Sequence, residues 1–352
     1  MKRILLAMAV LLASCGSTSS ESEIETEEIT GTQILADDNF EGGTCRFFSG
    51  DTLVFWCDNP QYIYTFAMLR GDSIISLGNV CKRGQGPREC TFASMFTDRE
   101  GKLFSITSFS GAMASINRHS AATASFIGEP VYLDSIVRRI KCSDLSIVPL
   151  SEDSIFFIGG DYNNLHQIFS LLDIRNKKLT ALDYWPEDGF RGNDFIKSNI
   201  YSDNAQLFTN YNGKYVYCTG LNRNAFIFTI NGQHVNIEKT LFDNPIKYEA
   251  ALDGINYKSD PEPESLRMKA TPHAIYFLMI DKDVRGADAK SSATSNYGDI
   301  VLKYDWEGNL MNKYKLDRVA FGINVADNDS TLYCQTEDPE TGETLMYRYS
   351  LK

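Results

Sequence analysis

The feature that most constrains the fold is a recurring pattern of short apolar strands. Runs rich in Val, Ile, Phe, Tyr and Thr and bounded by Gly, Asn, Asp or Pro are typical of β-strands. One such strand returns every 50 to 60 residues: "TLVFWC" at 52, "KLFSIT" at 102, "SIFFIG" at 154, "KYVYCT" at 214, "AIYFLM" at 274 and "TLYCQT" at 331. A second apolar strand follows each of them, such as "YIYTFAML" or "AFIFTIN". No segment keeps a helical apolar period over about 12 residues, so the pattern predicts an all-β fold.

Repeats of about 50 residues with four short strands each are typical of the blades of a β-propeller. Six copies predict a six-bladed β-propeller of four-stranded blades over residues 32–352. The sixth copy ends at the C-terminus without its outer strand, and the segment "TQILADDNF", residues 32–40, is available to supply it. We therefore expect the ring to be closed by this N-terminal strand, which removes an exposed sheet edge.

The first 14 residues have the pattern of a lipoprotein signal peptide. The basic start "MKR" precedes an apolar run of about ten residues, which is too short to span a membrane. The following "LLASCG" resembles the lipobox of bacterial lipoproteins. This resemblance implies that Cys15 becomes the first mature residue and carries lipid, which would anchor the protein to a membrane. The alternative is an ordinary secreted protein with a cysteine at this position.

Residues 15–31 are predicted to be a flexible tether. The stretch is polar and acidic, and such a composition cannot bury enough apolar surface to fold. Gly16 stands where an aspartate would favour retention at the inner membrane, so the outer membrane is favoured. An acidic tether also resembles the surface-export signals of Bacteroidota lipoproteins. Because the acidic residues begin only at Glu21, the side of the outer membrane stays open.

Charge and cysteine content restrict the partners and the redox chemistry. The formal net charge of −12 argues against a nucleic-acid partner, because nucleic-acid binding depends on basic groups that neutralise phosphates. An extracytoplasmic location permits disulfides. Cys81 and Cys90 are the best candidate pair among the eight cysteines. Without Cys15 the number is odd, so at least one thiol stays unpaired within the chain.

The segment "CKRGQGPREC", residues 81–90, is interpreted as a connector between the first two blades. Gly84 and Gly86 allow backbone angles that other residues avoid, Pro87 stiffens the turn, and Glu89 is placed to brace it. The alternative is a phosphate-binding loop. That loop needs a third glycine where Glu89 stands, with a helix after it, so a structural turn is favoured.

The lipobox, the acidic tether and this connector together resemble the TolB-like six-bladed propeller lipoproteins of Bacteroidota. That family carries a G-x-G-P-x-E-F-like connector in an early blade. Here Cys90 follows Glu89 where an aromatic residue or leucine is usual. The resemblance implies the fold and the envelope location, and it implies little about activity.

No catalytic, metal or cofactor site is predicted. The histidines lie far apart and form no H-x-H, H-E-x-x-H or C-x-x-C pattern with their neighbours, so a zinc site is not indicated. The stretch "TSFSGA" at 107 lacks the first glycine of a nucleophile elbow. Binding is favoured over catalysis, and the question of an enzyme stays open.

The long loops predict a recognition surface. In a propeller blade with strands A to D, the B–C loops and the D–A connectors to the next blade lie on one face. The long segments 79–91, 185–204, 243–268 and 281–299 are all of these two types. The candidate binding residues on this face are Arg83, Arg88, Tyr162, Trp185, Arg191, Arg223 and Arg285. The alternative is that each of them only braces its own loop.

Three functions stay open from the sequence. The first is a membrane-anchored extracytoplasmic binding module that recognises a protein or a glycan through the loop-rich face. The second is a calcium-dependent hydrolase or lactonase, although calcium needs six to eight oxygen ligands and inner strands such as "MKATPH" offer few carboxylates. The third is a structural subunit of an envelope complex. The fold alone does not choose between them.

Overall fold

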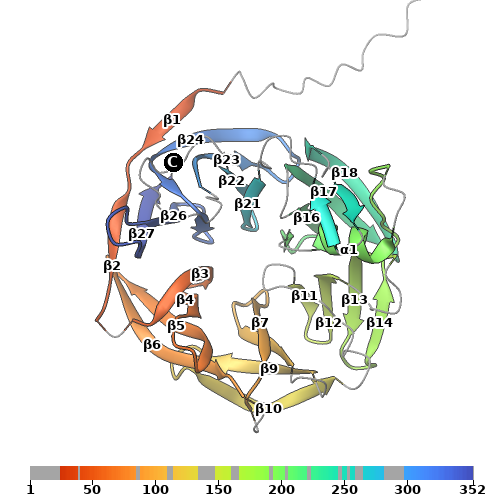
Figure 1. Cartoon of the computed structure of the whole chain (residues 1–352), viewed down its shortest axis with the longest axis horizontal. Helices are drawn as coiled ribbons and strands as arrows, with labels where there is room; N and C mark the ends of the chain where they lie inside the picture. The colour runs from red at the N-terminus through yellow and green to blue at the C-terminus, as the bar shows by residue number, and fades with distance from the viewer. Residues whose placement is uncertain are drawn as a thin grey trace, which may run out of the picture.

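The computed structural model describes the chain as sheets arranged in a ring, with β3, β7, β11 and β21 near its centre (Figure 1). The described residues are 24–38, 40–84, 88–108, 114–133, 147–159, 166–189, 193–202, 205–219, 223–244, 248–251, 254–257, 265–280 and 297–351. An all-β propeller with four-stranded blades is confirmed.

Four sheets of the ring stand apart as separate blades. One contains β7 (Phe92–Thr97), β8 (Leu103–Ser108), β9 (Ala114–Ser120) and β10 (Ser125–Leu133). The next contains β11 (Ile147–Ser151), β12 (Ser154–Ile158), β13 (Phe169–Asp173) and β14 (Lys178–Ala181). The third contains β15 (Gln206–Thr209), β16 (Lys214–Cys218), β17 (Asn224–Asn231) and β18 (His234–Asp243). The fourth contains β21 (Ser265–Ala270), β22 (Ile275–Ile280), β23 (Gly298–Tyr304), β24 (Leu310–Ala320) and β1 (Thr26–Ile29).

The remaining part of the ring is one eight-stranded sheet. Its strands are, in spatial order, β25 (Gly322–Val325), β26 (Thr331–Glu337), β27 (Thr344–Ser350), β2 (Thr32–Ala36), β6 (Ser73–Lys82), β5 (Tyr62–Arg70), β4 (Thr52–Cys57) and β3 (Gly42–Ser49). The structure therefore reads as four separate blades and not as the six that the sequence predicted. The physical reason is β2, because it pairs with both β27 and β6 and so joins eight strands into one sheet. A two-stranded hairpin of β19 (Tyr248–Ala251) and β20 (Gly254–Tyr257) stands apart from the other sheets.

The N-terminal strand β2 ties the two ends of the chain together. It pairs antiparallel with β27 in the register Thr32↔Arg348, and Leu35↔Ser73 begins its parallel pairing with β6. This pairing confirms that residues 32–36 lie beside the last strand of the chain. Ile34 is buried between the two partners.

Part of the segment predicted to be a tether is a strand. β1, within residues 15–31, pairs in parallel with β24 in the register Thr26↔Lys313 to Ile29↔Leu316. The acidic residues of β1 lie beside β24, which carries Lys313 and Lys315. The negative charge of β1 is therefore complementary to the positive charge of β24. The acidic composition, which predicted flexibility, also suits pairing with a basic strand.

The core lies between neighbouring sheets. All six recurring strands of the sequence pattern are strands in the structure, namely β4, β8, β12, β16, β22 and β26. Their alternating apolar side chains pack on the next sheet, as Phe156 of β12 does on Tyr215 and Phe228. Burying apolar side chains from both faces of each sheet is what holds the ring together.

One helix, α1 (Asp194–Ser202), interrupts the all-β pattern and was not predicted. Asn193 precedes it and accepts a hydrogen bond from the Phe195 N–H at 2.8 Å, which is an N-cap contact. Ile200 and Tyr201 are buried. At nine residues, the helix is too short to give the helical period that a sequence search requires.

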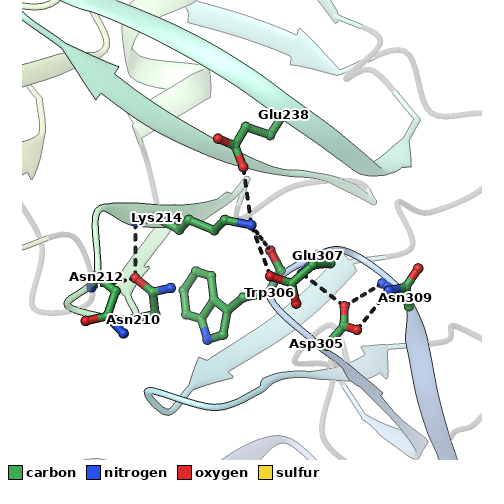
Figure 2. A network of polar contacts seen from close by, with 8 residues as sticks. All are labelled: Asn210, Asn212, Lys214, Glu238, Asp305, Trp306, Glu307 and Asn309. Atoms are coloured by element: carbon green, nitrogen blue, oxygen red, sulfur yellow. Dashed lines mark hydrogen bonds and ion pairs between the residues drawn. The ribbon is translucent and has the colours of Figure 1, made fainter.

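The A–B and C–D turns form the face of the ring opposite the connectors, and polar contacts fix them to one another. Lys214, after the turn between β15 and β16, donates to the Trp306 carbonyl oxygen at 3.0 Å and pairs with Glu307 and Glu238 (Figure 2). Asp305 accepts the backbone N–H groups of Glu307 and Asn309. We call this side the turn face, and the side with the B–C loops and D–A connectors the connector face.

Candidate functional site

The centre of the ring contains a cavity of about 150 Å³. Six strands contribute lining residues, namely β3, β7, β11, β15, β21 and β25. Several lining residues come from the ends of these strands or from the A–B turns after them, such as Tyr211, Pro272 and Asp327. The cavity therefore lies toward the turn face, whereas the sequence placed the functional loops on the connector face.

Two charged residues line this cavity, Lys269 and Asp327. The Lys269 ammonium donates to the Arg46 carbonyl oxygen at 2.6 Å and lies 5.6 Å from the ring centre of Phe208. Burial raises the pKa of the Asp327 carboxyl, and the negative charge of Asp329 raises it further. The cavity thus has a cation and a carboxylate among its walls.

Two further cations accompany Lys269 on the inner strands. Arg267 lies two residues earlier on β21, so its side chain leaves the same side of the strand. Burial lowers the pKa of Arg267, and the positive charge of Arg46 lowers it further. Burial raises the pKa of the Cys45 thiol to about 12, against the opposing effect of Lys269 and Arg46. Arg46, Arg267 and Lys269 are therefore close enough to share one electrostatic environment, and we call them the axial cations.

On the connector face, Trp56 lies near two arginines. The guanidinium carbon of Arg46 is 5.0 Å from the centre of the indole ring, and that of Arg83 is 5.9 Å from it. The Arg83 Nε also donates to the Tyr62 carbonyl oxygen at 3.1 Å. No ion pair joins Arg83 to a carboxylate among the described residues. Arg83 is a predicted site residue, and the structure places it beside an aromatic ring that the sequence analysis did not single out.

The connector that carries Arg83 is a tight structural turn. The Gly84 N–H donates to the Cys90 carbonyl oxygen at 3.2 Å, and the Cys90 N–H donates to the Lys82 carbonyl oxygen at 3.0 Å. Glu89 braces the turn through an ion pair with Lys82 at 2.8 Å. A Cβ on Gly84 would lie 2.0 Å from Glu89 Oε2, so a larger residue there would displace the Glu89 side chain. Gly86 and Pro87 lie outside the described residues.

Cys81 and Cys90 are both buried and are free thiols in the structure, so the predicted disulfide is not formed in it. The two side chains are adjacent, because a hydrogen bond with Cys81 is the main cause that lowers the pKa of Cys90. Their backbones already hold the short connector closed. The disulfide stays a prediction.

Two other predicted arginines brace neighbouring elements. Arg88 donates to the Gly128 carbonyl oxygen at 3.5 Å and lies 3.8 Å from Glu129, next to the irregular part of β10. Arg223 donates to the Ile280 carbonyl oxygen at 3.4 Å and so links two blades. These contacts correspond to the alternative in which such residues hold their loops.

Trp185 covers a buried ion pair. Its indole ring stacks on His166 with ring centres 4.2 Å apart, and the Lys197 ammonium lies 5.2 Å from its centre. Lys197 pairs with Asp188 at 2.7 Å, and their side chains are 6% and 3% exposed. Asp188 also accepts the hydroxyl groups of Tyr201 and Tyr248 at 3.0 and 2.8 Å. Trp185 therefore caps a polar cluster that anchors α1.

The structure does not test the remaining predicted residues. Cys15, Tyr162, Arg191 and Arg285 lie outside the described residues. Of the predicted residues that are described, Arg83, Arg88, Trp185 and Arg223 belong to separate local contacts, and no contact among the described residues joins them into one patch.

The described part of the chain contains no group of three or more His, Cys, Asp or Glu side chains that could hold a metal ion. Within those same residues, no helix has the length and apolar character needed to cross a membrane.

Trp56 and the axial cations were not predicted from the sequence. Trp56 stands in a recurring apolar strand, which marked it as core. Arg46, Arg267 and Lys269 stand on inner strands, where only carboxylates were sought. The sequence signal that could have identified the axial cations is a basic residue on an innermost strand of a blade, because that strand faces the ring axis.

Comparisons with known proteins find distant structural similarity alone. No protein-family profile and no curated protein matches the chain. Among solved structures, a protein of unknown function from Bacteroides thetaiotaomicron aligns over 91% of this chain and 75% of its own, with 9% identity and a TM-score of 0.47. A gluconolactonase from Xanthomonas campestris aligns over 89% and 88%, with 11% identity and a TM-score of 0.46. The β-propeller domain of Myceliophteria thermophila Cps50 aligns over 92% and 100%, with 11% identity and a TM-score of 0.42. Similarity this distant carries no argument about activity.

Proposed function

We propose that this protein is a membrane-anchored binding propeller of the cell envelope that recognises an acidic protein or glycan through its connector face. The observation that carries the proposal is the group of Arg83, Arg46 and Trp56. A guanidinium beside an indole ring offers both a positive charge and an apolar surface, and this combination suits anionic partners. On a chain with a net charge of −12, such a group is a local exception.

The finer architecture belongs to the same proposal. The eight-stranded sheet divides at β2 into β3–β6 and β25–β27, each of which ends at an inner strand that lines the cavity. Counted in this way, the ring has six blade equivalents, as in the TolB-like propeller lipoproteins of Bacteroidota. The lipobox-like "LLASCG" supports a lipid on Cys15 and an outer-membrane location.

The anchor is tested by Cys15→Ala. We expect this variant to be released as soluble protein, while the wild type partitions with membranes. A variant that stays with the membrane fraction would remove the lipid from the proposal.

The recognition surface is tested by partner capture from intact cells with wild type, Arg83→Ala and Arg70→Ala, at low and high salt. Arg70 ends β5 and lies at a C–D turn on the turn face, so it is a matched control of the same charge. We expect Arg83→Ala to weaken partner capture by about five- to tenfold, a loss of roughly 1 kcal/mol. Capture by this variant should also depend less on salt than capture by the wild type.

A second variant, Trp56→Phe, keeps an aromatic side chain in the strand but reduces the surface offered to the two guanidinium groups. We expect it to weaken capture less than Arg83→Ala does. Equal capture by Arg83→Ala and Arg70→Ala would place recognition elsewhere on the molecule.

A further inference from the structure

The axial cations are placed together by two strands that are far apart in the sequence. Lys269 and Arg267 lie on β21, and Arg46 lies on β3, 223 residues away from Lys269. The hydrogen bond from the Lys269 ammonium to the Arg46 carbonyl oxygen joins these strands. The strands β21 and β3 both contact β25, and the positive charge of Arg46 acts on Arg267.

The described residues do not provide Arg267 with a counter-charge. No hydrogen bond or ion pair joins its side chain to another residue in the described part of the chain. The pKa of Arg267 is lowered, first by burial and then by Arg46, which means that the charged form is held in an unfavourable place. Bringing like charges together away from water is unfavourable unless an opposite charge is added.

The adjoining cavity limits the size of the missing group. Its volume is about 150 Å³, and Lys269 is the one axial cation among its lining residues. A space of this size admits a small ion and excludes a polymer. Asp327, the carboxylate among the lining residues, lies at an A–B turn next to Asp329, whose negative charge further disfavours its ionised form.

We propose that Arg267, Lys269 and Arg46 form a binding site for a small oxyanion, a carboxylate or a phosphate, at the centre of the ring. Guanidinium groups are suited to such ligands because their N–H donors match the spacing of two oxygens. The site shares Arg46 with the recognition surface proposed for Arg83 and Trp56, so it is tested with Arg267 and Lys269, which lie outside that surface, and with different ligands.

The test is calorimetric titration of the full mature chain with inorganic phosphate and, in a second arm, with succinate. We expect saturable binding of at least one anion to the wild type. Arg267→Gln and Lys269→Gln should each weaken it by about tenfold or more. Arg175→Gln, which removes an exposed arginine on the turn face, should bind as the wild type does. The stronger arm identifies the oxyanion class.

Thermal unfolding supplies a second readout that does not depend on heats of binding. Phosphate stabilises many proteins non-specifically by exclusion from their surface, and that effect grows without saturation. The site-specific increase in melting temperature should saturate, and it should be present in the wild type and in Arg83→Ala but absent in Arg267→Gln. The proposal is overturned if neither anion binds the wild type saturably, or if Arg267→Gln binds as tightly as the wild type.

Discussion

Lys197 is a buried cation and Arg267 a half-buried one, and the surroundings of these two side chains differ. Lys197 has Asp188 at 2.7 Å, the Pro186 carbonyl oxygen as a second acceptor and the Trp185 ring above it. Arg267 has a second cation nearby and no hydrogen-bond or ion-pair partner among the described residues. A buried charge whose partners are all supplied by the fold serves the structure. A charge without such partners is what the proposed oxyanion site requires.

The largest expected effect concerns the buried cluster in which Asp188 contacts Lys197, Tyr201 and Tyr248. Asp188→Asn should lower the free energy of unfolding by about 3 to 5 kcal/mol, because it leaves the Lys197 charge buried without a carboxylate. Urea denaturation measures this loss. Asp153→Asn breaks the exposed pair with Arg175 and should cost less than about 1 kcal/mol. Similar losses in the two variants would show that the Asp188 cluster is not a structural centre.

A smaller effect is expected from His119, a buried group that the fold keeps neutral. Burial lowers its pKa to about 4, while one ring nitrogen lies 2.8 Å from the Ser105 hydroxyl. The unfolded chain binds a proton below about pH 6.5 and the folded chain does not, so stability is present above that pH and is lost as pH falls toward 4. The full loss is about 3 kcal/mol.

Denaturation of wild type and His119→Gln across this pH range measures that contribution. The difference in unfolding free energy between the two proteins should shrink as the pH falls, whereas His273→Gln, at an exposed position, should follow the wild type. A constant difference at all pH values would mean that His119 contributes packing alone.

The smallest effect, and the one that sharpens the comparison most, is expected from Arg267→Met. Removal of a half-buried charge without a partner among the described residues should leave the unfolding free energy unchanged or raise it by about 1 kcal/mol. Arg223→Met removes a hydrogen bond to the Ile280 carbonyl oxygen and should instead lower it by roughly 1 kcal/mol. A loss of several kcal/mol in Arg267→Met would place Arg267 with Lys197 as a structural residue.

Much of the fold could be predicted because strand patterns are local. The recurring apolar strands correspond to β4, β8, β12, β16, β22 and β26, and the segment at 32 pairs with β27 as expected. The double pairing of β2 could not be predicted, because the approach of β6 depends on how neighbouring sheets curve around the axis. Helix α1 was missed because its stability comes from the Asn193 cap and from burial of Ile200, and not from a long helical repeat of apolar residues.

The candidate site was harder to predict because it depends on contacts between distant residues. Arg83 was identified from its loop, but its neighbour Trp56 comes from a different strand. Arg46 and Arg267 are separated by more than 200 residues and meet only when the ring forms. Single basic residues on apolar strands resemble ordinary exposed positions until the axis of the ring is known.

The position of β2 also determines the order in which the chain can fold. The Tyr347 hydroxyl reaches Gln33 across a separation of 314 residues, so this contact cannot form until almost the whole chain has been made. Its other partner, β6, begins only at Ser73 and is available early. Because local contacts form before distant ones, we expect β2 to pair first with β6 and last with β27. The strand made near the start of synthesis thus completes its pairing at the end.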